Sequence, residues 1–302
     1  MPITTRVTTT FGCRHPLQQA GMGGMATPAL AIAVAGAGGI GMLSGTGGRA
    51  GLSAQLDAVP SGAVVGVSFL VPFLDREAVS EAAHRCPLVE LFWGTPDPAL
   101  VDLVHQGGAR AGWQVGAADE ARAAEGAGCE LVVAQGHEAG GHVRGTVGLL
   151  PLLDEVRRAA EVPVIAAGGI GTGRAMAAAL MAGADGVRVG TRFVASAESD
   201  AHPAYVEALI AAGADDTEVT TAFDDGWPDA PHRVLSSSIE AGRRLGESQV
   251  WSPAWPSVGA KGAVEARALY AGQSVGAVRG RLPAAEVVAE LVAEAEALLA
   301  TR

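Results

Sequence analysis

The sequence is poor in cysteine, the residue that holds together small secreted domains and many metal sites. Its three cysteines, Cys13, Cys86 and Cys129, lie far apart along the chain. An odd number of widely spaced cysteines argues against a disulfide framework and does not match the spacing of zinc ligands. We therefore expect three reduced thiols in a cytoplasmic protein, and no bound metal.

Positive charge is also scarce. The chain has 21 basic residues against 32 acidic ones, which gives a net charge of −11 at neutral pH. Nucleic-acid-binding proteins need basic patches that neutralise phosphates, and the sequence shows no local cluster of this kind. We therefore predict that the protein has no nucleic-acid partner.

Long hydrophobic runs are missing, although 49% of the residues are hydrophobic. The longest run, residues 29–43, is rich in glycine and alanine and falls short of the roughly 18 residues that span a bilayer. Its pattern changes from helical to strand-like midway. No apolar signal core follows the first arginines. These features predict a soluble protein without membrane association.

Strand-like and helix-like segments alternate along the first two thirds of the chain. Eight short apolar segments are predicted strands, at residues 17–20, 40–43, 63–70, 87–93, 110–115, 131–135, 163–167 and 186–189. Each except the last is followed by a helical pattern, which indicates a parallel sheet. Eight such units are typical of a closed (β/α)8 barrel, the TIM barrel, so the predicted fold class is α/β.

The last third of the sequence does not alternate in this way. We expect a barrel over residues 1–196, a mostly helical lid over residues 197–270, and a C-terminal segment over residues 271–302 that packs back on the barrel. The lid holds three of the five tryptophans and the proline-rich stretch 251–256. A helical pattern over residues 284–299 predicts the closing helix.

The segment 135–142, with the sequence QGHEAGGH, contains the densest polar chemistry in the chain. It follows the apolar residues 131–134, so it is predicted to leave the carboxyl end of a buried strand, where barrel active sites lie. Small residues would let a ligand approach the backbone closely. A histidine titrates near neutrality, and His142 is flanked by Gly140 and Gly141. We predict that His142 faces the substrate, whereas His15, His84, His105, His202 and His232 have no comparable context.

Two further glycine loops follow the last two predicted strands. Gly168 and Gly169 follow residues 163–167, and Gly190 and Thr191 follow residues 186–189. In phosphate-binding barrels the loops after strands seven and eight donate backbone N–H groups to a phosphate. Arg188 and Arg192 flank the second loop. Alternation along the strand would put both side chains on the same side as Gly190, so one of them is a candidate for neutralising the phosphate.

These segments together resemble the nitronate monooxygenase family, formerly called 2-nitropropane dioxygenases, which includes the flavin-dependent enoyl-acyl-carrier-protein reductases of the FabK type. The resemblance rests on residues 135–142, 163–170 and 183–193, and extends from residues 19–22 to residues 271–273. Three positions depart from the family pattern. Gly21 replaces a usual proline, Ser68 stands where asparagine is common, and Arg188 stands where glutamine is common.

The resemblance implies a barrel that binds FMN non-covalently, with His142 as the catalytic base. It implies that Gln135 and Gly140 contact the flavin, that Ala20 and Met22 meet its ring, and that the two glycine loops hold its phosphate. The full set of cofactor contacts inferred from the resemblance is Ala20, Gly21, Met22, Ser68, Gln135, Gly140, Gly141, Ala167, Gly168, Gly169, Arg188, Val189, Gly190, Thr191 and Gln273.

The activity implied by the resemblance is oxidation of alkyl nitronates or nitroalkanes with O2 to a carbonyl compound and nitrite. The alternative is NAD(P)H-dependent reduction of an enoyl thioester through the same flavin. An acyl carrier partner is acidic, so the acidity of this chain mildly disfavours that alternative. A third reading is a barrel that binds flavin or a metabolite without catalysis. The sequence leaves open whether NAD(P)H is used and whether the protein forms a homo-oligomer.

Overall fold

Eight parallel strands form one closed sheet in the computed structural model, which describes residues 2–246 and 255–301. The order in the sheet is β1-β9-β8-β6-β5-β4-β3-β2. A parallel bridge between Gln18 and Ile40 joins β1 to the residue before β2, so the sheet closes on itself. The predicted TIM barrel is therefore confirmed. The strands are β1 (Leu17–Gln19), β2 (Gly41–Ser44), β3 (Val65–Leu70), β4 (Leu88–Phe92), β5 (Arg110–Val115), β6 (Leu131–Gln135), β8 (Val164–Ala167) and β9 (Gly186–Val189).

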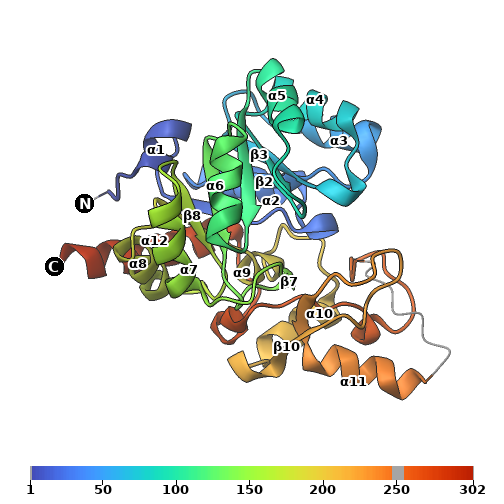
Figure 1. Cartoon of the computed structure of the whole chain (residues 1–302). Coiled ribbons are helices and arrows are strands. Elements are labelled where there is room, and N and C mark those ends of the chain that lie inside the picture. The colour runs from blue at the N-terminus through green and yellow to red at the C-terminus, as the bar shows by residue number, and fades with distance from the viewer. Residues whose placement is uncertain (1, 247–254, 302) are drawn as a thin grey trace.

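Helices cover the outside of the barrel, as Figure 1 shows. Several begin at a side-chain cap. Thr27, for example, accepts a hydrogen bond from the backbone N–H of Leu30, and a proline follows at the first helical position. Only one helical turn, α9 (Thr191–Val194), directly follows β9, and α12 (Ala284–Ala300) packs between α8 and α2 instead. The other outer helices are α2 (Pro28–Gly36), α3 (Gly48–Asp57), α4 (Arg76–Arg85), α5 (Pro98–Gln106), α6 (Ala118–Gly126), α7 (Leu149–Ala159) and α8 (Gly173–Met181).

A short helix that the sequence did not predict, α1 (Arg6–Phe11), closes the amino end of the barrel. Val7 and Phe11 belong to the same buried cluster as side chains from the starts of the strands, such as Leu88 and Leu131. Arg6 pairs with Asp185, just before β9, at 2.6 Å. With this end plugged, the carboxyl end of the barrel is where a ligand can enter.

The lid carries a sheet as well as helices. Helices α10 (Pro203–Ala211) and α11 (Ser236–Leu245) accompany strands β10 (Thr217–Thr220) and β11 (His232–Leu235). The third strand of this antiparallel sheet is β7 (Gly141–His142), which comes from the barrel loop after β6. The sequence predicted a mostly helical lid and missed this sheet. Residues 251–254 of the proline-rich stretch lie outside the described residues.

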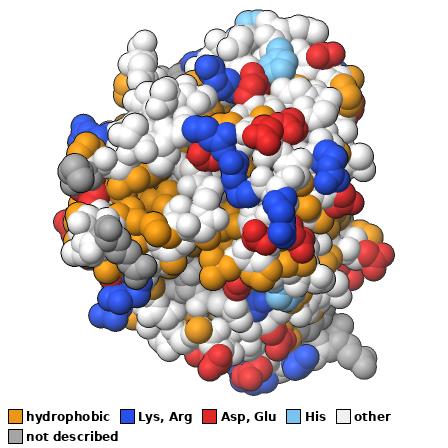
Figure 2. Space-filling model, turned by 60° about the vertical axis from the view of Figure 1, so that its left-hand side comes forward, with side chains coloured by type: hydrophobic (Ala, Val, Ile, Leu, Met, Phe, Trp, Pro, Cys, Tyr) orange, Lys and Arg blue, Asp and Glu red, His pale blue; other side chains and the backbone are white. Residues whose placement is uncertain are grey.

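The described surface mixes both signs of charge. On the face shown in Figure 2, acidic and basic side chains are interspersed among apolar ones. No helix among the described residues is long and apolar enough to cross a membrane. In the same part of the chain, no group of three or more histidine, cysteine or acidic side chains is arranged to hold a metal ion.

A buried charge network fills the barrel interior below the carboxyl ends of the strands. The Arg188 guanidinium on β9 pairs with the Glu90 carboxylate on β4, and both side chains are almost fully buried. Arg188 also donates to the Oε1 atoms of Gln18 at 2.9 Å and Gln114 at 2.6 Å. Gln18 in turn donates to Glu90 at 2.6 Å. Four strands therefore meet in one satisfied polar cluster.

We expect Glu90→Leu to lower the free energy of unfolding by about 3–5 kcal/mol, because it leaves Arg188 buried without a counter-charge. The double variant Glu90→Leu/Arg188→Met should recover most of that loss. Urea unfolding followed by tryptophan fluorescence measures both. Arg158→Ala, which removes an exposed pair with Asp154, is the control and should change stability by under about 1 kcal/mol. A Glu90→Leu variant as stable as the wild type would contradict this account.

Candidate active site

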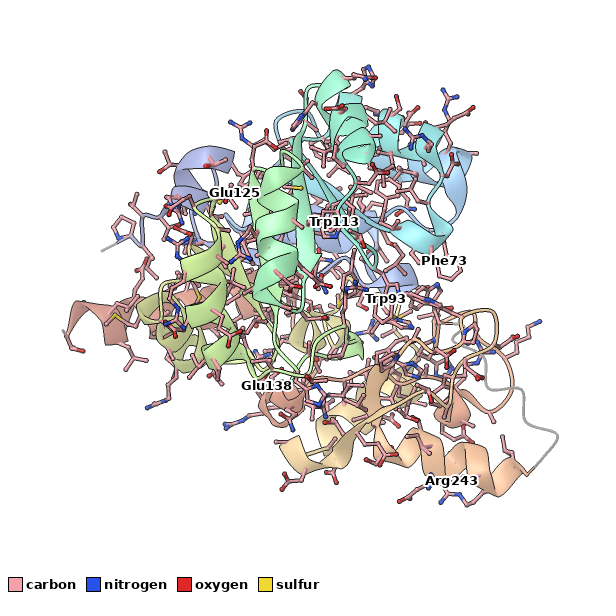
Figure 3. All side chains as sticks on the ribbon, viewed as in Figure 1. Phe73, Trp93, Trp113, Glu125, Glu138 and Arg243 are labelled. Carbon is pink, nitrogen blue, oxygen red and sulfur yellow. The ribbon has the colours of Figure 1, made fainter. Side chains whose placement is uncertain are left out.

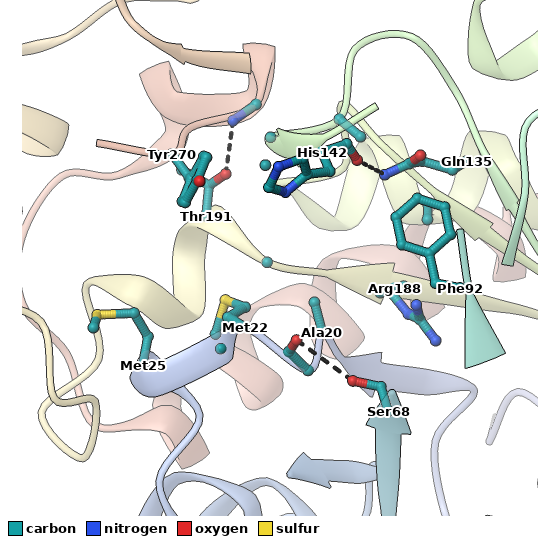
Figure 4. Close-up of a pocket in the computed structure, with 18 of the residues that line it drawn as sticks. Ala20, Met22, Met25, Ser68, Phe92, Gln135, His142, Arg188, Thr191 and Tyr270 are labelled. Atoms are coloured by element: carbon teal, nitrogen blue, oxygen red, sulfur yellow. Dashed lines mark hydrogen bonds between the residues drawn. The ribbon is translucent and has the colours of Figure 1, made fainter. Parts of the chain in front are cut away.

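One pocket opens at the carboxyl ends of the barrel strands, and the lid covers part of it. Its wall combines the tips of β1, β3, β4, β6, β8 and β9 with β7 and the lid residues Tyr205, Trp255, Tyr270 and Gly272. Figure 4 shows this convergence. Most predicted site residues line the pocket, namely Ala20, Gly21, Met22, Ser68, Gln135, Gly140, Gly141, His142, Ala167, Gly168, Gly169, Arg188, Gly190 and Thr191.

The loop that carries His142 is held in place from both sides. The Gln135 side-chain amide donates to the carbonyl oxygen of His142 at 2.9 Å, a contact drawn in Figure 4. The Glu138 carboxylate accepts from the backbone N–H of Leu149 at 3.0 Å and so caps α7. The antiparallel pairing of β7 with β11 then fixes the backbone at His142 and thereby the direction of its side chain. The Gln135 amide and the Glu138 carboxylate therefore hold the loop in its shape.

Aromatic rings surround the imidazole of His142. Trp227 from the lid stacks on it, with ring centroids 4.0 Å apart and an angle of 29° between the planes. Trp93, His232 and Tyr270 lie with their centroids 5.8, 5.2 and 5.7 Å away. Burial, and then the neighbouring His232, lower the pKa of His142 to about 3. The imidazole is therefore uncharged at neutral pH, so one ring nitrogen carries a proton and the other has a free lone pair.

Two aromatic rings of the barrel contact Trp227 and so join the barrel to the lid. Phe73 and Trp93 belong to the barrel loops and contact Trp227 edge-on, with centroids 4.9 and 5.0 Å apart. Figure 3 shows Phe73 and Trp93 at the boundary between the barrel and the lid. Trp93 adopts a left-handed backbone conformation with φ of 69°. That conformation is unfavourable for a bulky residue, so tertiary contacts hold it there.

Glycine backbone forms the opposite wall of the pocket. Gly168 and Gly169 both have positive φ, 108° and 69°, which turns their backbone in a way that other residues rarely adopt. Gly190 and Thr191 follow on the adjacent strand β9 and begin the single turn of α9. The first N–H groups of a helical turn have no acceptor within the helix. These loops are therefore suited to bind a phosphate.

The predicted role of an arginine at the phosphate receives no support from the geometry. Arg188 points into the barrel interior and pairs with Glu90. Arg192 donates to the Ala277 carbonyl oxygen at 2.9 Å and pairs with Glu290 at 2.6 Å. Both guanidinium groups are thus committed to carboxylates of the chain, which leaves the backbone N–H groups of the glycine loops as the candidate donors to the phosphate.

Two departures from the family pattern contact each other. The Ser68 hydroxyl donates to the carbonyl oxygen of Gly21 at 3.5 Å, as Figure 4 shows. A Cβ atom at position 21 would lie only 2.0 Å from the Ser68 Oγ. The proline that is usual at this position would therefore not fit beside Ser68 as it is oriented here. The glycine and the serine are matched to each other.

Two predicted contacts do not line the pocket. Val189 is fully buried, and the Gln273 side chain is exposed, although the Gln273 backbone N–H bonds to the Glu138 carbonyl oxygen at 3.0 Å. Sequence reasoning missed four residues around His142, which are Trp93, Trp227, His232 and Tyr270, and also Trp255, which lines the pocket. Their only signal was the gathering of tryptophans in the lid, and no sequence pattern connected His232 to His142.

A TIM barrel with a catalytic histidine candidate and a glycine-lined wall belongs to the class of cofactor-binding barrel enzymes. The family model of nitronate monooxygenase matches residues 64–294. The chain therefore belongs to the nitronate monooxygenase family, and it is a flavin-dependent oxidoreductase. The recognition made from the sequence motifs is confirmed.

Three relatives illustrate the range of the family. FabK from Thermotoga maritima is 31% identical, with a TM-score of 0.85 over 99% of this chain and 98% of that chain. Nitroalkane oxidase from Streptomyces ansochromogenes is 31% identical, with a TM-score of 0.78 over 98% and 99%. A Mycobacterium tuberculosis protein, (3aS,4S,5R,7aS)-5-hydroxy-7a-methyl-1-oxo-octahydro-1H-indene-4-carboxyl-CoA dehydrogenase, is 36% identical over 249 residues, 79% of this chain and 68% of its own length.

We expect Gly140→Ala to weaken flavin binding by roughly 5- to 100-fold, because overpacking costs about 1–3 kcal/mol. Its Cβ atom would lie 2.4 Å from the backbone nitrogen of Gly272, which cannot yield without moving the lid segment. Fluorescence titration of the apoprotein with FMN measures the affinity. Gly36→Ala in α2 is the control, since open space surrounds that position. Equal affinities in the two variants would contradict the assigned role of this close backbone contact.

Proposed function

We propose that the protein is an FMN-dependent enzyme that oxidises nitroalkanes or their nitronates with O2 to a carbonyl compound and nitrite, with His142 as the base. The observation that carries this proposal is a buried, uncharged imidazole that lines the same pocket as the glycine wall. The kinship with nitroalkane oxidase supports the choice of substrate class.

The residues of the pocket fit FMN. Gly168, Gly169 and the Gly190–Thr191 turn offer backbone donors to one phosphate. The Thr191 Oγ1 accepts from the Gly272 N–H at 3.0 Å, so the lid segment closes directly beside these loops. That closure supports a mononucleotide in preference to a dinucleotide. Ala20, Met22, Gln135 and Gly140 would meet the flavin ring from the strand tips.

His142 performs the proton transfer in this mechanism. A neutral nitroalkane carries an acidic proton on the carbon next to the nitro group, and the imidazole lone pair takes it. The product is an imidazolium beside an anionic nitronate, and the low dielectric of the pocket strengthens their attraction. The flavin, when bound, supplies the redox chemistry that O2 completes. A nitronate that is already formed needs no base, only the positioning that the pocket provides.

Reduction of an enoyl thioester with NAD(P)H is the alternative, and the fold shared with FabK supports it. That reaction requires the enzyme to donate a proton to the product, whereas the low pKa of His142 leaves this group without the extra proton at neutral pH. An uncharged imidazole can accept the nitroalkane proton, but its lowered pKa also makes it a weaker base than a free histidine. The choice of oxidation therefore rests mainly on the likeness to nitroalkane oxidase. The sequence leaves open whether NAD(P)H is used and whether the protein forms a homo-oligomer.

We expect His142→Ala to lower kcat/KM for a neutral nitroalkane by about 10²- to 10⁴-fold, the usual contribution of a general base. Turnover of the preformed nitronate should fall much less. Oxygen uptake and nitrite release, without NAD(P)H, measure both reactions. The control is His84→Gln, which changes an exposed histidine on α4.

Equal losses with both substrates would remove the base assignment and leave His142 a positioning role. Absence of oxygen uptake by the FMN-loaded wild type with either substrate would overturn the proposed function and direct attention to NAD(P)H-driven enoyl reduction. A protein that binds no FMN would contradict the cofactor assignment itself.

A further inference from the structure

His232 lies against His142 through a direct cross-strand pairing. The two residues occupy paired positions in the β7–β11 ladder, and their ring centroids are 5.2 Å apart. His232 is 1% exposed and belongs to the lid, 90 positions further along the chain. It does not line the pocket itself. The His232 imidazole therefore lies behind the candidate base, where it can reach His142 but not the substrate.

The protonation pattern of the His232 ring follows from its hydrogen bond. The Nδ1 atom lies 2.8 Å from the carbonyl oxygen of Ala230, which only accepts, so Nδ1 carries the proton. In the neutral ring Nε2 is then a bare acceptor. This atom is buried and has no hydrogen-bond partner within the described part of the chain. Leaving such an atom unpaired costs about 1–3 kcal/mol, so a donor beside it is favoured.

Two of the rings that neighbour His232 carry a hydrogen-bond donor. One is the hydroxyl group of Tyr270, whose ring centroid is 5.8 Å from that of His232. The other is the ring N–H of His142, with centroids 5.2 Å apart. With each nitrogen about 1.2 Å from its ring centre, an in-line N–H···N bond of about 2.9 Å places the centres about 5.3 Å apart. The spacing of the two ring centres thus matches such a bond. The bond is not formed in the structure, where Nε2 of His232 has no partner among the described residues, so forming it requires the rings to turn toward each other.

We propose, on the basis of the function proposed above, that His232 is a positioning residue for His142. Its Nε2 accepts a hydrogen bond from one ring nitrogen of His142, and this bond fixes the tautomer in which the other nitrogen is bare and faces the pocket. Serine hydrolases orient their catalytic histidine with a carboxylate in the same way. An imidazole in this place orients the base without adding negative charge beside an anionic product.

The first test reads the tautomers directly and needs no turnover. Two-bond ¹⁵N–¹H correlation spectra of the ¹⁵N-histidine-labelled protein, with and without FMN, report which nitrogens carry protons. We expect a proton on Nδ1 of His232 and a single tautomer for His142. In His232→Leu, the His142 signals should change to a mixture of tautomers, whereas Tyr270→Phe should leave them single. A single, unchanged His142 tautomer in His232→Leu would overturn the proposal.

The second test is kinetic. We expect His232→Leu to lower kcat for a neutral nitroalkane by roughly 10- to 100-fold, comparable to other losses of an orienting partner, while KM changes less than about threefold. Turnover of the preformed nitronate should stay near that of the wild type. His232→Gln, whose amide oxygen can accept in place of Nε2, should restore most of the loss. FMN content and thermal melting establish that each variant is folded and loaded.

The outcomes separate this proposal from the function on which it rests. Equal losses for nitroalkane and nitronate, or the lack of any rescue by His232→Gln, would show a merely structural role and overturn the positioning. A wild type that oxidises neither substrate would overturn the proposed function alone. The tautomers of His142 in the wild type and in His232→Leu would still decide the positioning in that case.

Discussion

The pairing of the two-residue strand Gly141–His142 with β11 is the contact on which the site depends. It ties a barrel loop into the sheet of the lid, so the candidate base is positioned by both parts of the molecule. Arg233, beside His232 on β11, is buried and donates to the carbonyl oxygen of His137 at 2.9 Å. The loop after β6 is therefore fastened to the lid at two points. A loop anchored in this way can hold a catalytic group with little freedom.

The barrel below the pocket has its own constraint, the burial of Arg188. A guanidinium in the interior is tolerated because Glu90 and two glutamines satisfy it, each from a different strand. The cluster spans β1, β4, β5 and β9 and so links opposite sides of the barrel. Since its positive charge is balanced locally, it contributes little net field to the pocket. This explains how an arginine can stand where the family often has glutamine.

The sequence predicted the barrel closely because each strand is a short apolar run, and because several outer helices, such as α2 and α5, begin at a side-chain cap followed by proline and end near glycine. The site was predicted where the motif is local, as in the glycine loops and the segment from Gln135 to His142. The missed features depend on contacts between distant positions. Glu90 and Arg188 are separated by 98 positions, and His142 and His232 by 90. No periodicity announces a two-residue strand, so the lid sheet could not be expected.

The stacking of Trp227 on His142 is compatible with the role proposed for His142 as a base. Stacking occupies a face of the imidazole, whereas both ring nitrogens bond in the plane of the ring. The ring can therefore be held by its face and still direct one nitrogen toward the pocket and the other toward β11. Phe73 and Trp93 support Trp227 edge-on, and each such aromatic contact contributes about 0.5–1.5 kcal/mol. Through these contacts the lid also helps to hold the His142 imidazole in place.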